Sequence, residues 1–261
     1  MLEVESVGKD YAGVVAVAEV SFGVEPAESV GVVGPNGSGK TTLLNIISGF
    51  ARPDRGRIVL GGREVTGRPA WTLSGLGVAR TFQLPQMPAR MSVLEVVLAG
   101  ARQPVSASPL GGLVRLRRSR AELAGAVERA DGLLERVGLR RLRDDPAASL
   151  SGGQQKLLNL VAALIGDPRL LLLDEPTAGV SPPLRKVLVG VLEEVRAKGT
   201  AIVTVEHDMA FVSEVCERVV VLDGGSVIAR CAPSELHLDE QVVEAYLGKR
   251  RADRGTRSEV G

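Results

Sequence analysis

The chain has 261 residues, of which 44% are hydrophobic and 24% charged, and its net charge is +1. This is the balance of a soluble globular protein, and the near-neutral charge argues against a dedicated nucleic-acid surface. The N-terminus, MLEVESVGKDY, lacks the basic start and apolar run of a signal peptide. The most apolar window, Leu157–Gly166, is shorter than the ~18 apolar residues that span a bilayer, so we expect no membrane-spanning segment. Cys216 and Cys231 are widely separated, which suggests neither a disulfide framework nor a zinc site but reduced cytoplasmic thiols.

The first part of the chain reads as short strands. Alternating apolar and polar residues predict half-buried strands at Leu2–Val7 and Val20–Glu25. The more continuous apolar run Glu28–Gly34 predicts a strand that is buried on both faces. It leads through a glycine-rich turn into the helical pattern TTLLNIISG, in which Gly49 fits a helix C-cap. A strand, a glycine loop and a helix in this order form a phosphate-binding unit.

The pattern becomes helical from Ser92 to Val137, where SVLEVVLAGA and RSRAELAGAVERADGLLERVG predict helices on either side of the loop QPVSASPLGG. Strand-like runs return at Arg169–Glu175, Thr200–Asp208 and Arg218–Gly225. The helical stretches between them fit right-handed βαβ crossovers and a parallel sheet. We therefore expect an α/β protein with a helical insertion.

The sequence GPNGSGKT fits the phosphate-loop pattern G-x-x-x-x-G-K-[ST] at every fixed position. Its glycines let successive N–H groups converge on phosphate oxygens, and the helix that follows adds its positive dipole end. Lys40 is predicted to reach the β- and γ-phosphates, and the Thr41 hydroxyl to ligate Mg²⁺. An ordinary glycine-rich turn is the structural alternative, and the strand before and the helix after argue against it. The predicted nucleotide-binding residues here are Gly34, Pro35, Asn36, Gly37, Ser38, Gly39, Lys40, Thr41 and Thr42.

An acidic pair, Asp174 and Glu175, ends the buried strand LLLLD. Ligands of doubly wound sheets lie just outside the carboxyl ends of the strands. Asp174 is predicted to orient Mg²⁺ and its waters, as the second acidic element of phosphate-loop NTPases does. Glu175 is predicted to be the general base that takes the proton from an attacking water. The alternative is that the pair merely ends a strand, and the phosphate loop makes this the weaker interpretation.

The motif LSGGQ, Leu150–Gln154, precedes the acidic pair and resembles the signature motif of ATP-binding-cassette (ABC) ATPases. Its first residues open a helix whose N-terminus can bind an anion. The resemblance implies a head-to-tail dimer, in which each ATP lies between one subunit's phosphate loop and the other subunit's signature. The nucleotide-binding residues that it implies are Ser151, Gly152, Gly153 and Gln154.

Other residues match further family motifs in the expected order. Tyr11 matches the aromatic residue that stacks on adenine, with an ordinary tyrosine at a strand edge as the alternative. Gln83, in ARTFQ, matches the glutamine that senses Mg²⁺ and joins the core to the helical part, although nearby Gln86 leaves the register open. His207, in VEHD, matches the switch histidine that contacts the γ-phosphate, whereas His237 reads as a surface residue.

One position departs from the family pattern. After DEPT the family most often has Ser-Ala-Leu-Asp, whereas this chain has Ala178–Ser181. Ser181 thus stands at the aspartate position of the loop that crosses the dimer interface. Its hydroxyl can still hydrogen-bond there, but charge-assisted contacts are lost. We expect hydrolysis to be tuned by this change rather than abolished.

The resemblance covers nearly the whole chain and implies a fold. This is a phosphate-loop NTPase core with a mostly parallel sheet, an N-terminal antiparallel β subdomain and an inserted helical subdomain. The expected organisation is one domain at 1–248, followed by a disordered tail at 249–261. Within the domain we expect a nucleotide-binding core at 1–90 and 158–235, a helical signature subdomain at 91–157 and a C-terminal helix at 236–248.

The finer resemblance is to ATP-binding subunits of branched-chain amino acid importers, on GVARTFQ, the AG-x-x-P loop, VEHDM and EAYLG. It implies permease subunits, a second ATP-binding subunit (identical or different) and indirectly a solute-binding protein as partners, at the cytoplasmic face of the membrane. Urea, amide and lipopolysaccharide transport ATPases are similar and stay open. An ABC ATPase acting on nucleic acid or ribosomes is the rival class, disfavoured by the single cassette and the absence of sustained heptads. The arginines of Arg115–Arg120 fit a membrane or partner contact or, more often, a solvated helical face.

Overall fold

The computed structural model describes residues 1–81, 87–101 and 112–246. The chain forms two compact units. The first, here named the core unit, comprises Met1–Arg80, Arg169–Thr177 and the chain from Glu193 onward. The second, the helical unit, comprises Thr81–Pro168 and Ala178–Leu192. The expected α/β class is confirmed, while the functional subdomain bounds expected from the sequence stay a prediction.

A six-stranded sheet lies in the core unit, in the order β10-β9-β3-β8-β7-β6. Strands β9, β3, β8, β7 and β6 pair in parallel, and β10 is antiparallel to β9. Every residue of β3, β7 and β8 is buried, as their continuous apolar runs require. The strands are β3 (Ser29–Val33), β6 (Val78–Arg80), β7 (Leu170–Asp174), β8 (Ala201–Val205), β9 (Arg218–Asp223) and β10 (Ser226–Cys231).

A second, antiparallel sheet of the core unit has the order β2-β1-β4-β5. Strands β1 and β2 form a hairpin whose tip is Ala12–Gly13, where the N–H of Gly13 donates to the Asp10 carboxylate at 2.8 Å. This hairpin places Tyr11 at the end of β1. The strands are β1 (Leu2–Tyr11), β2 (Val14–Val24), β4 (Arg55–Leu60) and β5 (Arg63–Glu64).

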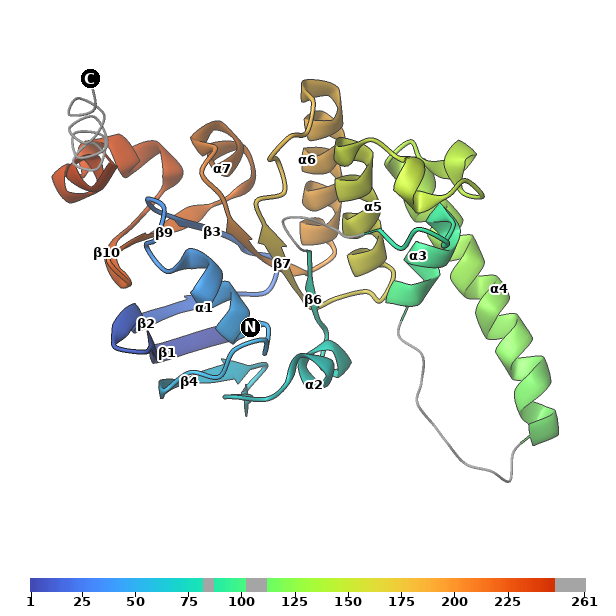
Figure 1. Cartoon of the computed structure of the whole chain (residues 1–261), viewed down its shortest axis with the longest axis horizontal. Helices are drawn as coiled ribbons and strands as arrows, with labels where there is room; N and C mark the ends of the chain where they lie inside the picture. The colour runs from blue at the N-terminus through green and yellow to red at the C-terminus, as the bar shows by residue number, and fades with distance from the viewer. Residues whose placement is uncertain (82–86, 102–111, 247–261) are drawn as a thin grey trace, which may run out of the picture. The chain divides into compact units, whose positions relative to one another are not determined.

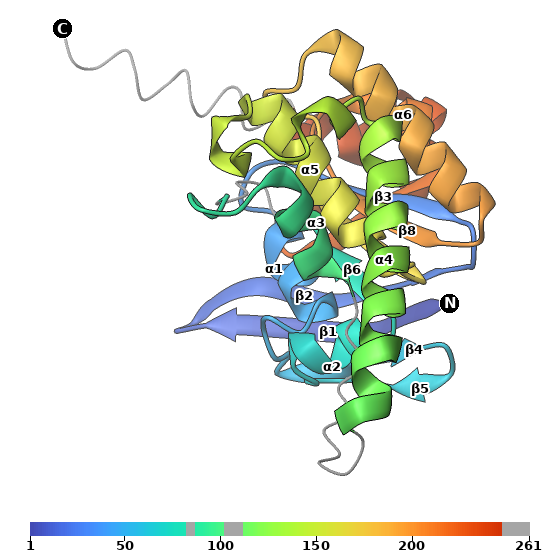
Figure 2. The same ribbon diagram turned by 90° about the vertical axis from the view of Figure 1, so that its right-hand side faces the viewer.

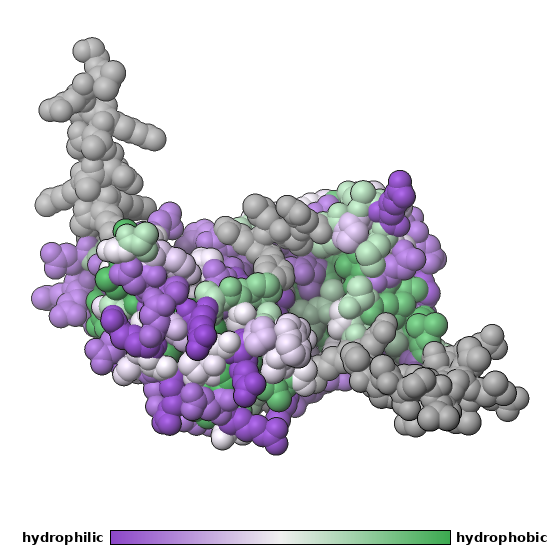
Figure 3. All heavy atoms as spheres, turned by 60° about the horizontal axis from the view of Figure 1, so that its bottom comes forward, coloured by the Kyte–Doolittle hydropathy of each residue, from purple (hydrophilic) through white to green (hydrophobic). Residues whose placement is uncertain are grey.

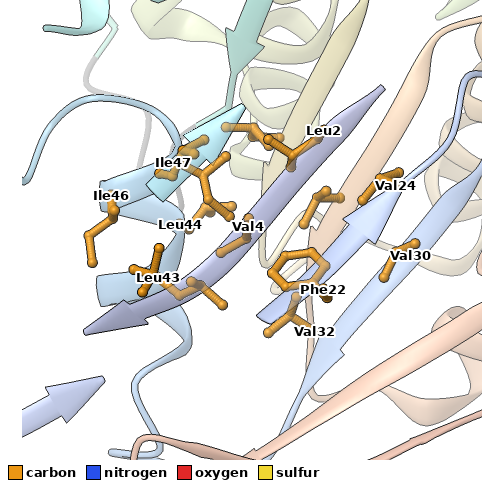
Figure 4. Close-up of a cluster of buried hydrophobic side chains, with 14 of the residues drawn as sticks. Leu2, Val4, Phe22, Val24, Val30, Val32, Leu43, Leu44, Ile46 and Ile47 are labelled. Carbon is orange, nitrogen blue, oxygen red and sulfur yellow. The ribbon is translucent and has the colours of Figure 1, made fainter. Parts of the chain in front are cut away.

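Helix α1 (Lys40–Ile47) joins the two sheets through one hydrophobic core. It contacts β2 of the antiparallel sheet and β7 and β8 of the parallel one (Figure 1). Figure 4 shows apolar side chains of β1, β2, β3 and α1 directed into this shared core. The position of α1, and of the loop that begins it, is therefore fixed by burial on two sides. The labelled members are Leu2, Val4, Phe22, Val24, Val30, Val32, Leu43, Leu44, Ile46 and Ile47.

The core unit also contains short helices. Helix α7 follows β8, and the 3-10 helix η4 packs against it before a further helical turn that includes the buried Val242. The bounds are α2 (Ala70–Gly75), α7 (Met209–Val215) and η4 (Pro233–Leu238). The expected C-terminal helix at 236–248 thus overlaps η4 and the helical residues 240–246, and the expected disordered tail lies outside the described residues.

The helical unit is built around α3, α4 and α5, which pack on one another (Figure 2). Ser92 caps α3 in a capping box with Glu95, which satisfies backbone N–H groups at the start of this short helix. Gly100, the last residue of α3, approaches α5 so closely that a Cβ there would lie 2.0 Å from the carbonyl oxygen of Ala162. The elements are α3 (Val93–Gly100), α4 (Gly112–Arg136), η2 (Arg140–Leu142), η3 (Ala147–Ser149) and α5 (Gly152–Leu164), with α6 (Pro182–Ala197) divided between the two units.

Several elements have no counterpart in the sequence-based expectations. They are strands β4, β5, β6 and β10 and helix α2, of which β5, β6 and β10 lie at sheet edges. A period of two or of 3.6 cannot be recognised in the two or three residues of β5 and β6, and the six-residue strands β4 and β10 lack a continuous apolar run. The loop expected at 103–112 lies almost wholly outside the described residues.

The surface mixes apolar and hydrophilic side chains on the face that Figure 3 shows. Within the described ranges, no helix combines the length and hydropathy that a membrane crossing requires. His237 is exposed, as expected, while Cys216 is buried and Cys231 partly exposed. Burial raises the pKa of the Cys216 thiol to about 11. The large exposed hydrophobic residues are Tyr11, Val14, Val15, Phe50, Trp71, Leu123, Leu238 and Val243.

The close approach of α3 to α5 predicts opposite effects for two glycine substitutions. Gly100→Ala is expected to destabilise the protein by about 1–3 kcal/mol, because the methyl group would force the helices apart. Gly132→Ala, in α4, is the matched control, because nothing lies within 4 Å of the added Cβ. It should stabilise by about 0.5–1 kcal/mol through helix propensity. Urea unfolding of both variants tests this, and a neutral Gly100→Ala would contradict the tight crossing.

Candidate functional site

Three strand ends meet at one edge of the parallel sheet. Strand β8 lies between β3 and β7. Val205, the last residue of β8, pairs with Val32 of β3 on one side and with Asp174 of β7 on the other. The loop Gly34–Thr41 follows β3, and His207 follows β8 shortly after Val205. The register therefore brings the predicted phosphate loop, the acidic pair and the histidine to the same level of the sheet edge, where ligands of such sheets bind.

The loop from Gly34 to Thr41 has the backbone that its glycines allow. Gly34 and Gly39 both have positive φ, and a Cβ on either would lie within 2.2 Å of a backbone oxygen. Gly39 is the N-cap of α1 and offers no capping side chain, which leaves the first-turn amides of the helix to bind an anion. The Lys40 ammonium donates to the carbonyl oxygens of Gly34 at 2.7 Å and Pro35 at 2.9 Å. The lysine is therefore held inside the loop, and Thr41 is exposed beside it.

Asp174 forms a buried ion pair that the sequence did not reveal. Nη2 of Arg80 lies 3.0 Å from Oδ2 of Asp174, and both side chains are less than a tenth exposed. The same guanidinium donates through Nη1 to Oδ1 of Asn45 in α1 and to Oγ of Ser48, the C-cap of that helix, each at 2.7 Å. Arg80 thereby ties the end of β7 to the helix that follows the phosphate loop. The only sequence signal was the arginine of ARTFQ, three residues before Gln83, and the residues that Arg80 contacts are distant from it in the sequence.

Glu175 and His207 lie side by side. Oε1 of Glu175 is 3.8 Å from Nδ1 of His207, and the imidazole is 61% exposed. Glu175 has a φ of 45°, a left-handed conformation that costs a non-glycine residue about 1 kcal/mol. Its N–H donates to the carbonyl oxygen of Val205 at 2.9 Å, which holds this backbone in place. The pair can therefore present a carboxylate and an imidazole to one ligand at the sheet edge.

The predicted signature opens α5 in the helical unit. Ser151 is the N-cap, and its N–H donates to the side chain of Gln154 at 2.9 Å in a capping box. Ser151 and Gly152 are exposed, so the N-terminal end of α5 reaches the surface. Gly153 is buried, and a Cβ there would lie 2.9 Å from the side chain of Leu184 in α6. The small residues thus let the helix end pack closely while it stays open to an anion.

Of the other residues at family motif positions, Tyr11 and Ser181 lie at the surface. Tyr11 is 47% exposed, and the ammonium of Lys9 lies 5.2 Å from its ring centroid, so one face of the ring carries a cation. Ser181 is exposed directly before α6. Gln83 and Gln86 lie outside the described residues. Arg115–Arg120 lie within α4, whose backbone alone is described there.

A family model described as "ABC transporter" matches residues 17–178. The chain belongs to the ABC transporter family. Like the expected fold, the predicted resemblance to this family is confirmed.

Relatives of this ABC cassette cover nearly its whole length. A probable branched-chain amino acid transport ATP-binding protein LivG of Archaeoglobus fulgidus is 38% identical, with 95% of each chain covered. The high-affinity branched-chain amino acid transport ATP-binding protein LivG of Escherichia coli (strain K12) is 33% identical over 95% of this chain and 98% of its own. A solved nucleotide-free ATP-binding cassette of an ABC transporter superposes with a TM-score of 0.82 at 34% identity, covering 94% of this chain and 98% of that one.

The buried pair of this cassette predicts a strong stability effect. Arg80→Met should destabilise it by about 3 kcal/mol or more, because the Asp174 carboxylate would stay buried after losing this ion pair. Arg57→Met is the matched control, since Arg57 pairs with Glu5 at 2.8 Å on the surface. That change should cost less than about 1 kcal/mol. Urea unfolding of both variants measures this. An equal decrease in the free energy of unfolding would contradict a special contribution of the buried pair.

Proposed function

We propose that this chain is the ATP-binding and ATP-hydrolysing subunit of a transporter that imports branched-chain or other amino acids. The observation that carries the proposal is the meeting of the phosphate loop, Asp174, Glu175 and His207 at adjacent strand ends. The similarity to relatives named as branched-chain amino acid transport ATP-binding proteins supports the choice of solute.

Nucleotide binding follows from the chemistry of the core unit. The amides of Gly34–Thr42 and the Lys40 ammonium would hold the phosphates, and the open face of the Tyr11 ring would stack on adenine. The Thr41 hydroxyl and the Asp174 carboxylate fit Mg²⁺, which prefers oxygen ligands and binds with substrate phosphates. With Gln83, they would hold the ion, which neutralises phosphate charge when bound.

Hydrolysis needs a base and a group that responds to the γ-phosphate. The Glu175 carboxylate would accept the proton of the attacking water, and its neighbour His207 would donate to the γ-phosphate. Lys40 would stabilise the charge that develops on the transferred phosphoryl group. Lys40, Glu175 and His207 come from the segments that follow β3, β7 and β8, so a shift of any one segment would disturb the alignment of the three side chains.

We also propose that two cassettes share each nucleotide. Ser151, Gly152, Gly153 and Gln154, at the exposed N-terminal end of α5, would contact the phosphates held by a second ATP-binding subunit. Ser181 would lie at that interface in place of the family's aspartate. The dimer would power permease subunits from the cytoplasmic face of the membrane, with a solute-binding protein as an indirect partner.

Glu175→Gln tests the hydrolytic role. The variant is expected to keep ATP binding, because the amide preserves shape and the phosphate loop is unchanged. Turnover should fall by at least about a hundredfold, since the general base is lost. ATP should then trap a dimer in size-exclusion chromatography. Lys40→Ala is the control, because it should weaken nucleotide binding itself. Normal turnover of Glu175→Gln would remove Glu175 from this role.

Affinity purification from detergent-solubilised native membranes, followed by mass spectrometry, tests the transport role. Polytopic permeases, with or without a second cassette subunit, are the expected companions, and a co-purified solute-binding protein would identify the solute. If that solute-binding protein or transporter binds urea, an amide or lipopolysaccharide instead, the proposed amino acid substrate is wrong. Recovery of ribosomal or DNA-repair proteins without permeases would overturn the transport role while leaving the ATPase chemistry intact.

A further inference from the structure

Glu206, directly before His207, carries a carboxylate that is fully buried, with 0% of its surface exposed. It directly follows β8. Strand β8 lies between β3, which leads into the predicted phosphate loop, and β7, which ends in Asp174. Burial of a carboxylate is costly unless its oxygens accept hydrogen bonds. The contacts of this side chain therefore indicate what it holds.

Both oxygens of Glu206 accept hydrogen bonds, and from two different loops. Oε1 accepts from the N–H of Thr177 at 2.9 Å and from its hydroxyl at 2.5 Å. Oε2 accepts from the N–H of His207 at 3.0 Å and of Asp208 at 3.3 Å. Thr177 lies two residues after Glu175. One carboxylate thus links the loop of Glu175 to the loop of His207 through charge-assisted bonds, which are stronger than neutral ones.

Backbone bonds hold the same strand ends at a point nearer the sheet. The N–H of Glu175 donates to Val205 at 2.9 Å, and that of Glu206 to Val32 at 3.4 Å. These bonds need no particular side chain at Glu206. The carboxylate instead bonds residues that follow the last paired residues of the strands, where no backbone ladder joins the two loops. Its loss should leave the sheet intact and loosen the loops.

We propose that Glu206 is a positioning residue for ATP hydrolysis, which fixes the loop of Glu175 and the loop of His207 relative to each other. The inference rests on the proposed function, because it gives those two residues their roles. Glu206 is too deeply buried to touch a nucleotide. It acts through Thr177, His207 and Asp208, and it sets the separation of the carboxylate and the imidazole.

Glu206→Gln is the central variant, since it keeps the shape of the side chain but turns one oxygen into an N–H₂ group. That group would face N–H donors, so one loop must lose its contacts. We expect kcat for ATP hydrolysis to fall about tenfold or more. The affinity for ATP should stay within about twofold, because the phosphate loop is untouched. Thr177→Val removes the hydroxyl contact alone and should lower kcat less.

The double variant Glu206→Gln, Thr177→Val separates positioning from general destabilisation. If the carboxylate acts through Thr177, the two effects on kcat will be less than additive. Thr204→Val is the matched control, because Thr204 is fully buried in β8, directly before the Glu206 segment, and its hydroxyl has no hydrogen-bond partner among the described residues. It should change neither kcat nor ATP affinity. Additive effects, or wild-type kcat in Glu206→Gln, would overturn the proposal.

Hydrogen–deuterium exchange gives a readout that needs no activity. Glu206→Gln should speed exchange of the amides of Thr177, His207 and Asp208 and leave those of β3 unchanged. Faster exchange throughout the sheet, or none in either loop, would overturn the positioning role. If the wild-type chain hydrolyses no ATP yet the two loops loosen as expected, the proposed function fails and the link between the loops stands. Should Glu206→Gln not fold, Thr177→Val and its exchange decide the question.

Discussion

A strand that is buried on both faces must exchange its backbone hydrogen bonds with neighbouring strands, because no water can replace them. This constraint fixes the register of β3, β8 and β7. Val205 pairs with both Val32 and Asp174, so the three strands end level with one another. The loops that follow have no freedom to start elsewhere. The meeting of the predicted phosphate loop, an acidic pair and a histidine is therefore a consequence of how three apolar runs hydrogen-bond.

Two buried charges extend this order beyond the sheet. Arg80 joins Asp174 to α1, and Glu206 joins the loop of Thr177 to that of His207. Buried charges are weak evidence of stability, since desolvation offsets much of their attraction. Their hydrogen bonds are directional, however, and removing one partner strongly destabilises the folded protein. Arg80 and Glu206 both contact residues at or shortly after the ends of β7 and β8.

In the helical unit, the N-terminal end of α5 is exposed although the helix is closely packed. The capping box of Ser151 and Gln154 orders the first turn of α5, while buried Gly153 lets α6 approach it. Gly100 does the same for α3 at the other end of α5. Glycine is needed at Gly100, where the backbone of Ala162 occupies the space of a Cβ, whereas at Gly153 only the end of the Leu184 side chain lies that close.

The sequence by itself determined the fold class, the strands at β3, β7 and β8 and the residues gathered at their ends. Apolar runs of five residues and the spacing of GPNGSGKT carry that information locally. Only the tertiary structure decided which groups brace the site. Arg80 and Asp174 lie 94 positions apart, and Thr177 and Glu206 lie 29 apart. Such contacts exist because folding brings strand ends together, and no period in the sequence encodes a hydrogen bond between distant side chains.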